Sequence, residues 1–188
     1  MSGEEPQGKQ VRPQAWNPGE IGRGIIRNDR VTRIGVLSDT HLREPEPDLG
    51  QRLAQVWGPV DMILHAGDLV NISVLDVLEA PEVLAVAGNM DDYVVSQSLP
   101  AKRIIAVEDK RIGLIHGWGS PMGLAGRVMK EFDQVDAIVF GHSHRPTNTV
   151  KNGVLLFNPG SFGSGFLGSG TVGVLTVADD IKGEIIQL

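Results

Sequence analysis

The sequence contains no cysteine, which excludes disulfide bridges and thiolate metal ligands. It also contains no run of about 18 apolar residues and no apolar stretch near its first residue. A membrane-spanning helix and a secretory signal are therefore not expected, and the missing cysteines fit a reducing compartment. These absences predict a cytoplasmic protein, without a membrane partner, whose metal or substrate contacts come from nitrogen and oxygen atoms.

Positive charge is also scarce, because 17 Lys and Arg residues stand against 23 Asp and Glu residues and the formal net charge is -6. A surface that coats nucleic acid needs an excess of cations, so no nucleic-acid surface is expected. An anionic substrate would need a local positive centre, and bound metal ions are the obvious candidates. With 188 residues, 41% of them hydrophobic, the chain is long enough for one domain with its own core.

Residues 1–30 differ in composition from the rest of the chain. They contain three prolines, several glycines and few apolar residues before Ile25. We expect an extension, flexible or draped over the surface, in which Trp16 is either an anchor or part of a loosely held tail. Residues 31–188 are expected to form a single domain, with the glycine-rich stretch 163–170 as a surface loop or, alternatively, a mobile lid.

Short apolar runs typical of buried strands alternate with helical patterns in the first half of this domain, which predicts parallel strands. The predicted strands span residues 33–37, 60–65 and 82–87, and the predicted helices are one capped by Asp48 and one at 72–78. In the second half, paired runs predict hairpins. The paired strands span 103–107 and 111–115, 147–150 and 154–157, and 171–178 and 183–188, with a helix at 122–132 and a strand at 135–140.

Polar residues stand where the predicted strands give way to loops. They are Asp39, His41, Asp68, Asn89, His116, His142 and His144, and they include four of the five histidines. Sites in α/β sheets are built at the carboxyl ends of the strands, so these side chains are expected to meet. Seven nitrogen and oxygen ligands exceed the four of a structural zinc and suit two divalent ions that share a bridging carboxylate, for which Asp68 is the best candidate.

The segment Gly141-His142-Ser143-His144 follows the predicted strand at 135–140. In extended backbone, residues two apart point to the same side, so both imidazoles can face one metal ion. Imidazole, carboxylate and amide ligands together suit Mn²⁺, Fe²⁺, Ni²⁺ or Zn²⁺ better than Ca²⁺. Two such ions close together would acidify a bridging water and bind both oxygens of an in-line phosphoryl displacement.

Five segments resemble, in order, the motifs of the calcineurin-like metallophosphoesterases. They are Ser38-Asp39-Thr40-His41, Gly67-Asp68, Gly88-Asn89, His116-Gly117 and Gly141-His142-Ser143-His144. The resemblance covers about residues 33–188 and points to the small bacterial and archaeal phosphodiesterase branch. It implies a four-layer α/β/β/α sandwich of mixed sheets, with a dinuclear site at the carboxyl ends of the strands and the last hairpin as an antiparallel addition.

The resemblance also implies which residues hold each ion. One ion would be held by Asp39, His41, Asp68 and His144, and the other by Asp68, Asn89, His116 and His142. The two neighbouring histidines would then divide between the ions instead of sharing one. Mn²⁺ is the first candidate for both ions, with Fe, Ni or Zn as alternatives.

The reaction implied is hydrolysis of a small-molecule phosphate ester, more a diester than a monoester, by in-line attack of a hydroxide that bridges the ions. Asp68, Asn89 and His142 would act through the metals. Arg145, beside the last motif, is a candidate for stabilising the transferring group, or else an ordinary exposed arginine on a loop. Homo-oligomerisation is left open.

Two positions depart from the family pattern. Met90 stands where many family phosphatases have a histidine that donates a proton, so the general acid is unidentified and good leaving groups would be favoured. Trp118 stands where relatives commonly have a second histidine, and it would either stack on an aromatic substrate group or wall the site. A scaffold function, as in the retromer subunit that shares this fold, is the alternative. A scaffold is expected to lose ligands, whereas all seven positions are filled here.

Three further residues or segments lie beside the motifs. His65 is expected to have a structural or supporting role and not to bind metal. Asp91 is expected either to hydrogen-bond a ligand residue or to cap a helix at residues 92–93. The turn at residues 158–161, Asn-Pro-Gly-Ser, is expected to shape the site and not to take part in the chemistry.

Overall fold

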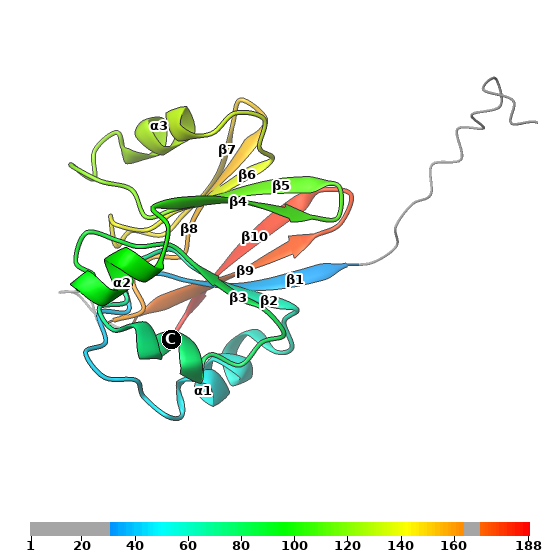
Figure 1. Ribbon diagram of the computed structural model, residues 1–188. Coiled ribbons are helices and arrows are strands. Elements are labelled where there is room, and N and C mark those ends of the chain that lie inside the picture. The colour runs from blue at the N-terminus through cyan, green and yellow to red at the C-terminus, as the bar shows by residue number, and fades with distance from the viewer. Residues whose placement is uncertain (1–30, 164–169) are drawn as a thin grey trace, which may run out of the picture.

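The computed structural model describes residues 31–163 and 170–188, and it contains two five-stranded sheets (Figure 1). The first sheet has the order β10-β9-β1-β2-β3. Its strands are β1 (Thr32–Leu37), β2 (Met62–His65), β3 (Val83–Ala85), β9 (Thr171–Val177) and β10 (Ile181–Gln187). Strands β1, β2 and β3 are parallel, as the alternation of strand and helix patterns predicted, and the hairpin β9–β10 adds antiparallel to β1.

The second sheet has the order β4-β5-β6-β8-β7. Its strands are β4 (Lys102–Val107), β5 (Lys110–Ile115), β6 (Ala137–Val139), β7 (Thr147–Lys151) and β8 (Val154–Asn158). The predicted hairpins β4–β5 and β7–β8 are both confirmed, and β5, β6 and β8 are parallel. Both sheets are therefore mixed, and each contributes parallel strand ends to the same edge of the molecule (Figure 1).

The sheets pack face to face because alternate residues of most strands are apolar on the inner side, β7 being the exception. Ile34 and Val36 of β1 belong to a core shared with Ile112 and Leu114 of β5, whereas Leu37 points to the opposite face of the first sheet. Full burial of such a side chain contributes roughly 1.5–3 kcal/mol. The inner layer is therefore held mainly by the hydrophobic effect, and polar side chains add contacts between the sheets, such as Arg103 Nε of β4, which donates to Ala85 O of β3 at 2.9 Å.

Helices cover the two outer faces. The first sheet is covered by α1 (Leu49–Trp57), the 3₁₀ turn η1 (Ile72–Val77) and α2 (Tyr93–Ser98), and the second by α3 (Leu124–Val128) and the 3₁₀ turn η2 (Met129–Glu131). Leu53 and Trp57 of α1 pack with Ile63 of β2, and Val128 of α3 packs with Ile138 of β6. The layer order is helix, sheet, sheet, helix, which confirms the expected sandwich.

Several elements differ from their predicted extent. The helix predicted at residues 122–132 is interrupted, since Gly123 has a φ of 75° and the chain tightens into η2 after Val128, although the apolar stripe is buried as expected. Asp48 occupies the position before α1 but does not cap it, and its carboxylate lies 3.6 Å from Arg52 instead. Strand β3 is shorter than residues 82–87.

Some predictions fall outside the described residues. They concern the N-terminal extension 1–30 with Trp16, and the glycine-rich loop or lid, of which residues 164–169 are not described. Within the described ranges, no helix has the length and apolar character needed to cross a membrane.

Candidate metal centre

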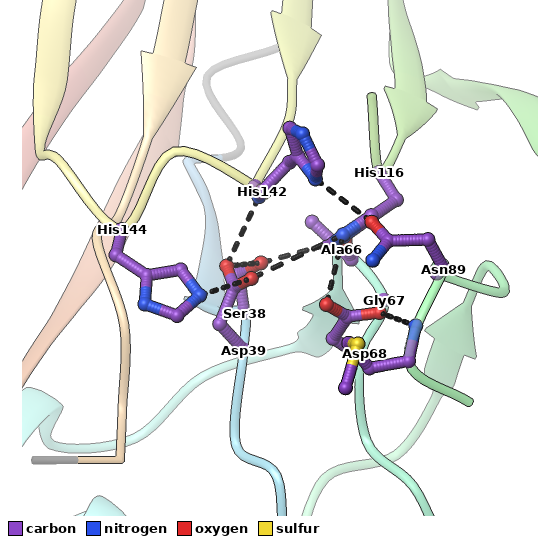
Figure 2. A network of polar contacts seen from close by, with 12 residues as sticks. Ser38, Asp39, Ala66, Gly67, Asp68, Asn89, His116, His142 and His144 are labelled. Carbon is purple, nitrogen blue, oxygen red and sulfur yellow. Dashed lines mark hydrogen bonds and ion pairs between the residues drawn. The ribbon is translucent and has the colours of Figure 1, made fainter. Parts of the chain in front are cut away.

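The predicted ligands gather at one edge, where strands of both sheets end. Figure 2 labels all of them except His41, whose Nε2 lies 3.4 Å from that of His144. Asp39 and His41 follow β1, Asp68 follows β2, and Asn89 follows β3 in the first sheet. The second sheet adds three residues. They are His116 after β5, and His142 and His144 after β6. The edge at which the site was predicted is therefore the edge at which the side chains meet.

The backbone of the site is left-handed at most of these positions, which the sequence did not reveal. Asp39, His41, Asp68, His142 and His144 have φ between 52° and 67°. Such a conformation costs energy in most residues and is tolerated where the surroundings hold it, often at functional sites. The premise that the two neighbouring histidines lie in extended backbone is therefore wrong. Their rings diverge toward different groups of partners (Figure 2).

Two glycines of the motifs are required by close approach. A Cβ on Gly141 would lie 1.9 Å from Ser38 Oγ, and a Cβ on Gly88 would lie 2.2 Å from Asp68 Oδ1. Any side chain at either position would therefore displace an Asp-bearing loop. The glycines allow strand ends from different parts of the chain to touch, which brings the ligands together.

On the outer side of the centre, Asp39, His41 and His144 place one ligand atom each within 4.8 Å of one another. His144 Nε2 lies 3.1 Å from Asp39 Oδ1 and 3.4 Å from His41 Nε2. Asp39 is fully buried, and its Oδ2 accepts from Ser38 Oγ at 2.5 Å and from the His142 amide at 3.2 Å. Its Oδ1 receives no hydrogen bond from the described residues. The Asp39 carboxylate raises the pKa of His144 above its usual value.

On the inner side, the tautomer of His116 is fixed by the backbone. Its Nδ1 lies 2.7 Å from Ala66 O, and since a carbonyl only accepts, Nδ1 carries the proton. In the neutral ring, Nε2 then turns a lone pair toward Asp68 Oδ2 at 3.2 Å and Asp39 Oδ1 at 4.0 Å. Nε2 is buried and has no hydrogen-bond partner among the described residues. Facing acceptors of this kind require a cation or a proton between them.

Charge couples these buried groups. Burial opposes a charge on His116, but Asp68 and Asp39 outweigh it and raise the pKa of His116. Burial also works to raise the pKa of Asp68, yet the contact with His116 and the Met90 N–H, which donates to Asp68 Oδ1 at 2.7 Å, lowers that pKa. Asp68 is therefore held as a carboxylate that favours a neighbouring positive charge.

His142 repeats the arrangement of His116. Its Nε2 donates to Gly119 O at 2.7 Å, so Nδ1 is unprotonated in the neutral ring and faces Asn89 Oδ1 at 2.8 Å. The His142 ring stands edge-on to the ring of His116, with centroids 5.3 Å apart. Two acceptor atoms again face each other, and a metal ion between them would be bound by both.

The donor set thus fits divalent metal ions. It combines buried carboxylates, imidazoles with a fixed tautomer and one amide oxygen, and it leaves Asp39 Oδ1 and His116 Nε2 unsatisfied. Two groups of closely spaced ligand atoms are present, and Asp39 belongs to both. Asp68 belongs to the inner group, so its role as the bridge stays a prediction.

Asp91 supports the centre through the backbone. Its carboxylate accepts from the amides of Asp68, Val70 and Gly88 at 3.2, 2.6 and 2.6 Å. Of its two predicted roles, the bond to a ligand residue is the one found, whereas Asp92 caps α2 through Val95 N. The sequence signal was a pair of adjacent aspartates, which alone cannot say which one caps the helix.

His65 and the turn at residues 158–161 make hydrogen bonds that tie the loops of the site together, while the prediction that they take no part in the chemistry stays a prediction. His65 Nδ1 accepts from Gly67 N at 3.2 Å, its Nε2 lies 3.1 Å from Thr40 Oγ1, and burial lowers its pKa to about 3. A neutral ring therefore joins the exits of β1 and β2. In the turn, Asn158 Nδ2 donates to Gly141 O at 2.7 Å and Ser161 Oγ to Asp39 O at 3.0 Å.

The remaining predicted residues lie at the rim. Arg145 is exposed, and its part in catalysis stays a prediction. Met90 contributes its backbone amide to Asp68, while its side chain is exposed and carries no proton to give. Trp118 is partly exposed and lines a hollow next to Asn89 and His116.

Comparison with known proteins agrees with this geometry. A model of the calcineurin-like phosphoesterase superfamily domain matches residues 32–180. A protein of Methanocaldococcus jannaschii, named "Probable metallophosphoesterase", is 39% identical over 132 residues, which cover 68% of this chain and 67% of that protein.

Solved structures show the same fold. One, described as a novel archaeal phosphodiesterase, has a TM-score of 0.66 at 22% identity and covers 84% of this chain and 100% of its own. Another, a single mutant of Vps29 from Entamoeba histolytica, has a TM-score of 0.63 at 23% identity and covers 84% of this chain and 99% of its own. Together with the match over residues 32–180, which spans most of the chain, these similarities show that the chain belongs to the calcineurin-like phosphoesterase superfamily.

Proposed function

We propose that this protein is a metal-dependent phosphodiesterase with two divalent ions at the edge where the strands end. The observation that carries the proposal is the set of facing acceptors. Asp39 Oδ1 and His116 Nε2 are buried and have only ion-pair contacts, with His144 Nε2 at 3.1 Å and with Asp68 Oδ2 at 3.2 Å, and His142 Nδ1 faces Asn89 Oδ1 at 2.8 Å. Cations satisfy such atoms, and carboxylate, imidazole and amide ligands suit Mn²⁺, Fe²⁺, Ni²⁺ or Zn²⁺.

The chain's own residues would hold the ions in two sets. The outer set is Asp39, His41, Asp68 and His144, and the inner set is Asp68, Asn89, His116 and His142. When bound, two such ions acidify a water molecule and offset the negative charge of the transferring phosphoryl group. Ala66 O and Gly119 O keep the inner imidazoles in the tautomer that turns a bare nitrogen to the centre.

The nature of residue 90 supports an ester with a good leaving group. Met90 donates only its backbone N–H, to Asp68, and its side chain cannot protonate a departing oxygen. An alcohol that leaves readily as its anion needs no such proton. The fold shared with the archaeal phosphodiesterase supports a diester, and Arg145 is the side chain proposed to approach its free phosphoryl oxygens.

The proposal is tested by assaying the purified chain with a bis-aryl phosphodiester and Mn²⁺, with Fe²⁺, Ni²⁺ and Zn²⁺ in parallel. Turnover is expected to follow metal content as ions are titrated into metal-free protein. No turnover with both sites shown to be filled by metal analysis would contradict the enzymatic function.

A scaffold function is the second candidate, because the fold is also that of Vps29. The filled ligand positions favour the enzyme. Asp68→Asn separates the two functions, since it keeps the size of the side chain and removes its charge. The enzyme would lose turnover, whereas a scaffold would keep partner binding and show no turnover to lose.

A further inference from the structure

A hollow of about 290 Å³ adjoins the inner side of the metal centre. Its lining includes Asn89 and His116, which are proposed ligands, together with Trp118, Lys102 and Glu131. Asn89 and His116 lie on the side of the centre opposite His144 (Figure 2). A group that fills this hollow would therefore be close enough to be esterified to a phosphate held by the inner ligands.

The indole of Trp118 is presented on a braced loop. Arg127 of α3 donates to Trp118 O from Nε at 3.2 Å and from Nη2 at 2.9 Å. The same guanidinium donates to Ser120 O and to Met122 O. The loop is further tied to the centre because Gly119 O accepts from His142. A backbone clamped at several carbonyls orders the loop before any ligand binds, which lowers the entropy cost of binding.

Trp118 keeps 44% of its surface exposed in spite of this brace. An aromatic residue whose backbone is held and whose side chain is still half-open is a platform on which a flat ring can stack. The apolar part of the hollow continues with Ile115, whose neighbour His116 turns its bare nitrogen toward the metal centre. The lining of the hollow thus combines apolar and aromatic residues with His116, a proposed metal ligand.

The lining of the hollow also contains a donor next to an acceptor. Lys102 Nζ donates to Glu131 Oε2 at 2.8 Å and to Glu131 O at 3.0 Å, and it lies 5.7 Å from the centroid of the Phe132 ring. An ammonium group beside a carboxylate offers a hydrogen-bond donor next to a hydrogen-bond acceptor. The edge of a nucleobase or a similar nitrogen heterocycle presents the complementary pattern, whereas a simple alkyl or phenyl group does not.

We propose that this hollow binds a planar nitrogen-heteroaromatic group of the substrate, of the kind a nucleobase provides, with Trp118 stacked on its face and Lys102 and Glu131 at its edge. The substrate class would then be a nucleoside phosphodiester. The position of the phosphate rests on the proposed function, whereas the binding of the ring depends only on the hollow. Trp118 is a specificity-determining residue in this proposal and takes no part in the chemical step.

Binding can be measured without turnover. Calorimetry with the full chain would compare adenosine 5′-monophosphate with ribose 5-phosphate, each with and without Mn²⁺. The nucleotide is expected to bind at least about tenfold more tightly, which is the range of one stacked base. Trp118→Ala should remove this difference and Trp118→Phe should keep most of it. Equal affinities for both ligands in the unaltered protein would overturn the proposal.

Tyr93→Ala is the matched control. Tyr93 is also an exposed aromatic residue of this edge, at 79% exposure, but it does not line the hollow. The variant should bind both ligands as the unaltered protein does. Metal content and the midpoint of urea unfolding should be unchanged in all three variants. A loss of nucleotide affinity in Tyr93→Ala equal to that in Trp118→Ala would overturn the assignment to the hollow.

Kinetics separates this inference from the proposed function. With a nucleoside aryl phosphodiester, Trp118→Ala should raise KM about tenfold and leave kcat nearly unchanged, whereas with methyl aryl phosphate both constants should stay the same. Equal effects on the two esters would overturn the specificity role. If no ester is hydrolysed but nucleotide binding still depends on Trp118, the proposed enzymatic function is wrong, whereas the assignment of the hollow as a ring-binding site is supported.

Discussion

The two sides of the metal centre are built differently. On the inner side, the side chain of His116 is only 2% exposed. One nitrogen of the His116 ring and one nitrogen of the His142 ring are each anchored to a backbone carbonyl. On the outer side, His144 is 43% exposed, and its ring contacts Asp39 and the ring of His41. Asp39 touches both sides and is fully buried. The comparison suggests a preorganised inner metal site and an outer site that exchanges its ion more readily.

The largest expected effect comes from Asp68, the residue that the two proposed ligand sets share. Asp68→Asn should lower the affinity for both ions and bring turnover of an aryl diester below detection, because neither set keeps its shared charged oxygen. Metal analysis after dialysis, combined with the diester assay, measures both losses. Retention of one full equivalent of tightly bound metal would show that the sides do not depend on a common carboxylate.

The two neighbouring histidines should then separate the sides. His142→Ala is expected to empty the inner site and His144→Ala the outer site, so each variant should bind one equivalent of metal where the unaltered protein binds two. The ion remaining in His144→Ala should be the one that exchanges more slowly, since Asp68 and His116 are buried and the rings of His116 and His142 are each anchored to a backbone carbonyl. Equal loss of both ions from either variant would contradict this division.

Asp91 tests whether backbone support matters for the inner side. Asp91→Ala leaves three amides without their acceptor, so we expect the inner ion to bind roughly 10–100-fold more weakly, as is typical when such support is removed. The free energy of unfolding should fall by about 3 kcal/mol, because three partly buried amides lose their acceptor and the cost of each lies near the low end of about 1–3 kcal/mol.

Its neighbour provides the control. Asp92→Ala removes the cap of α2 and should cost about 1 kcal/mol in unfolding free energy without changing metal affinity. If both variants weaken metal binding equally, the effect arises from the loop as a whole and not from the contacts of Asp91.

The smallest effect concerns His65, which joins two strand exits as a neutral ring. Its pKa is about 3 in the folded protein, against 6.5 as the ordinary value. Between these values the unfolded chain binds one more proton, so the free energy of unfolding should fall as the pH drops below about 6.5. The slope from this residue approaches about 1.4 kcal/mol per pH unit, and its contribution is complete above pH 6.5.

Urea unfolding of metal-free protein at pH 7, 6 and 5 measures this slope. His65→Asn removes the titrating group and keeps a hydrogen-bonding side chain. The raised pKa values of His116 and His144 act in the opposite sense. They are common to the unaltered protein and His65→Asn, so they cancel in the difference between the two unfolding free energies. A difference in stability that does not change with pH would show that His65 is not held neutral.

Much of the site was predictable because it depends on short-range pattern. Strands ending in polar residues and glycine mark the ligand positions, and the edge of the sheets at which parallel strands end brings them together. The same pattern predicted His65 and the turn at residues 158–161 as structural. The helix at residues 122–132 was predicted too long, because apolar spacing cannot detect the change to 3₁₀ geometry after Val128.

Other features depend on contacts between residues far apart in the chain. The tautomer of His116 is set by Ala66 O, 50 residues away, and that of His142 by Gly119 O, 23 residues away. The choice between Asp91 and Asp92 was decided by amides that follow β2. No local pattern contains this information, since the carbonyls and amides belong to every residue type alike.

The sequence alone therefore predicted the strands, the hairpins and the seven polar residues at the strand ends, whereas the layered fold was implied by the resemblance of its motifs to a known family. Periodicity, glycine and the chemistry of side chains are properties of neighbouring residues, which is why they can be read in order. Only the tertiary structure decided which nitrogen of the His116 and His142 rings is unprotonated and which carboxylate, that of Asp39, belongs to both groups of ligand atoms. It also decided that Trp118 lines the hollow beside the centre. These depend on the left-handed turns and distant carbonyls that packing of the two sheets imposes.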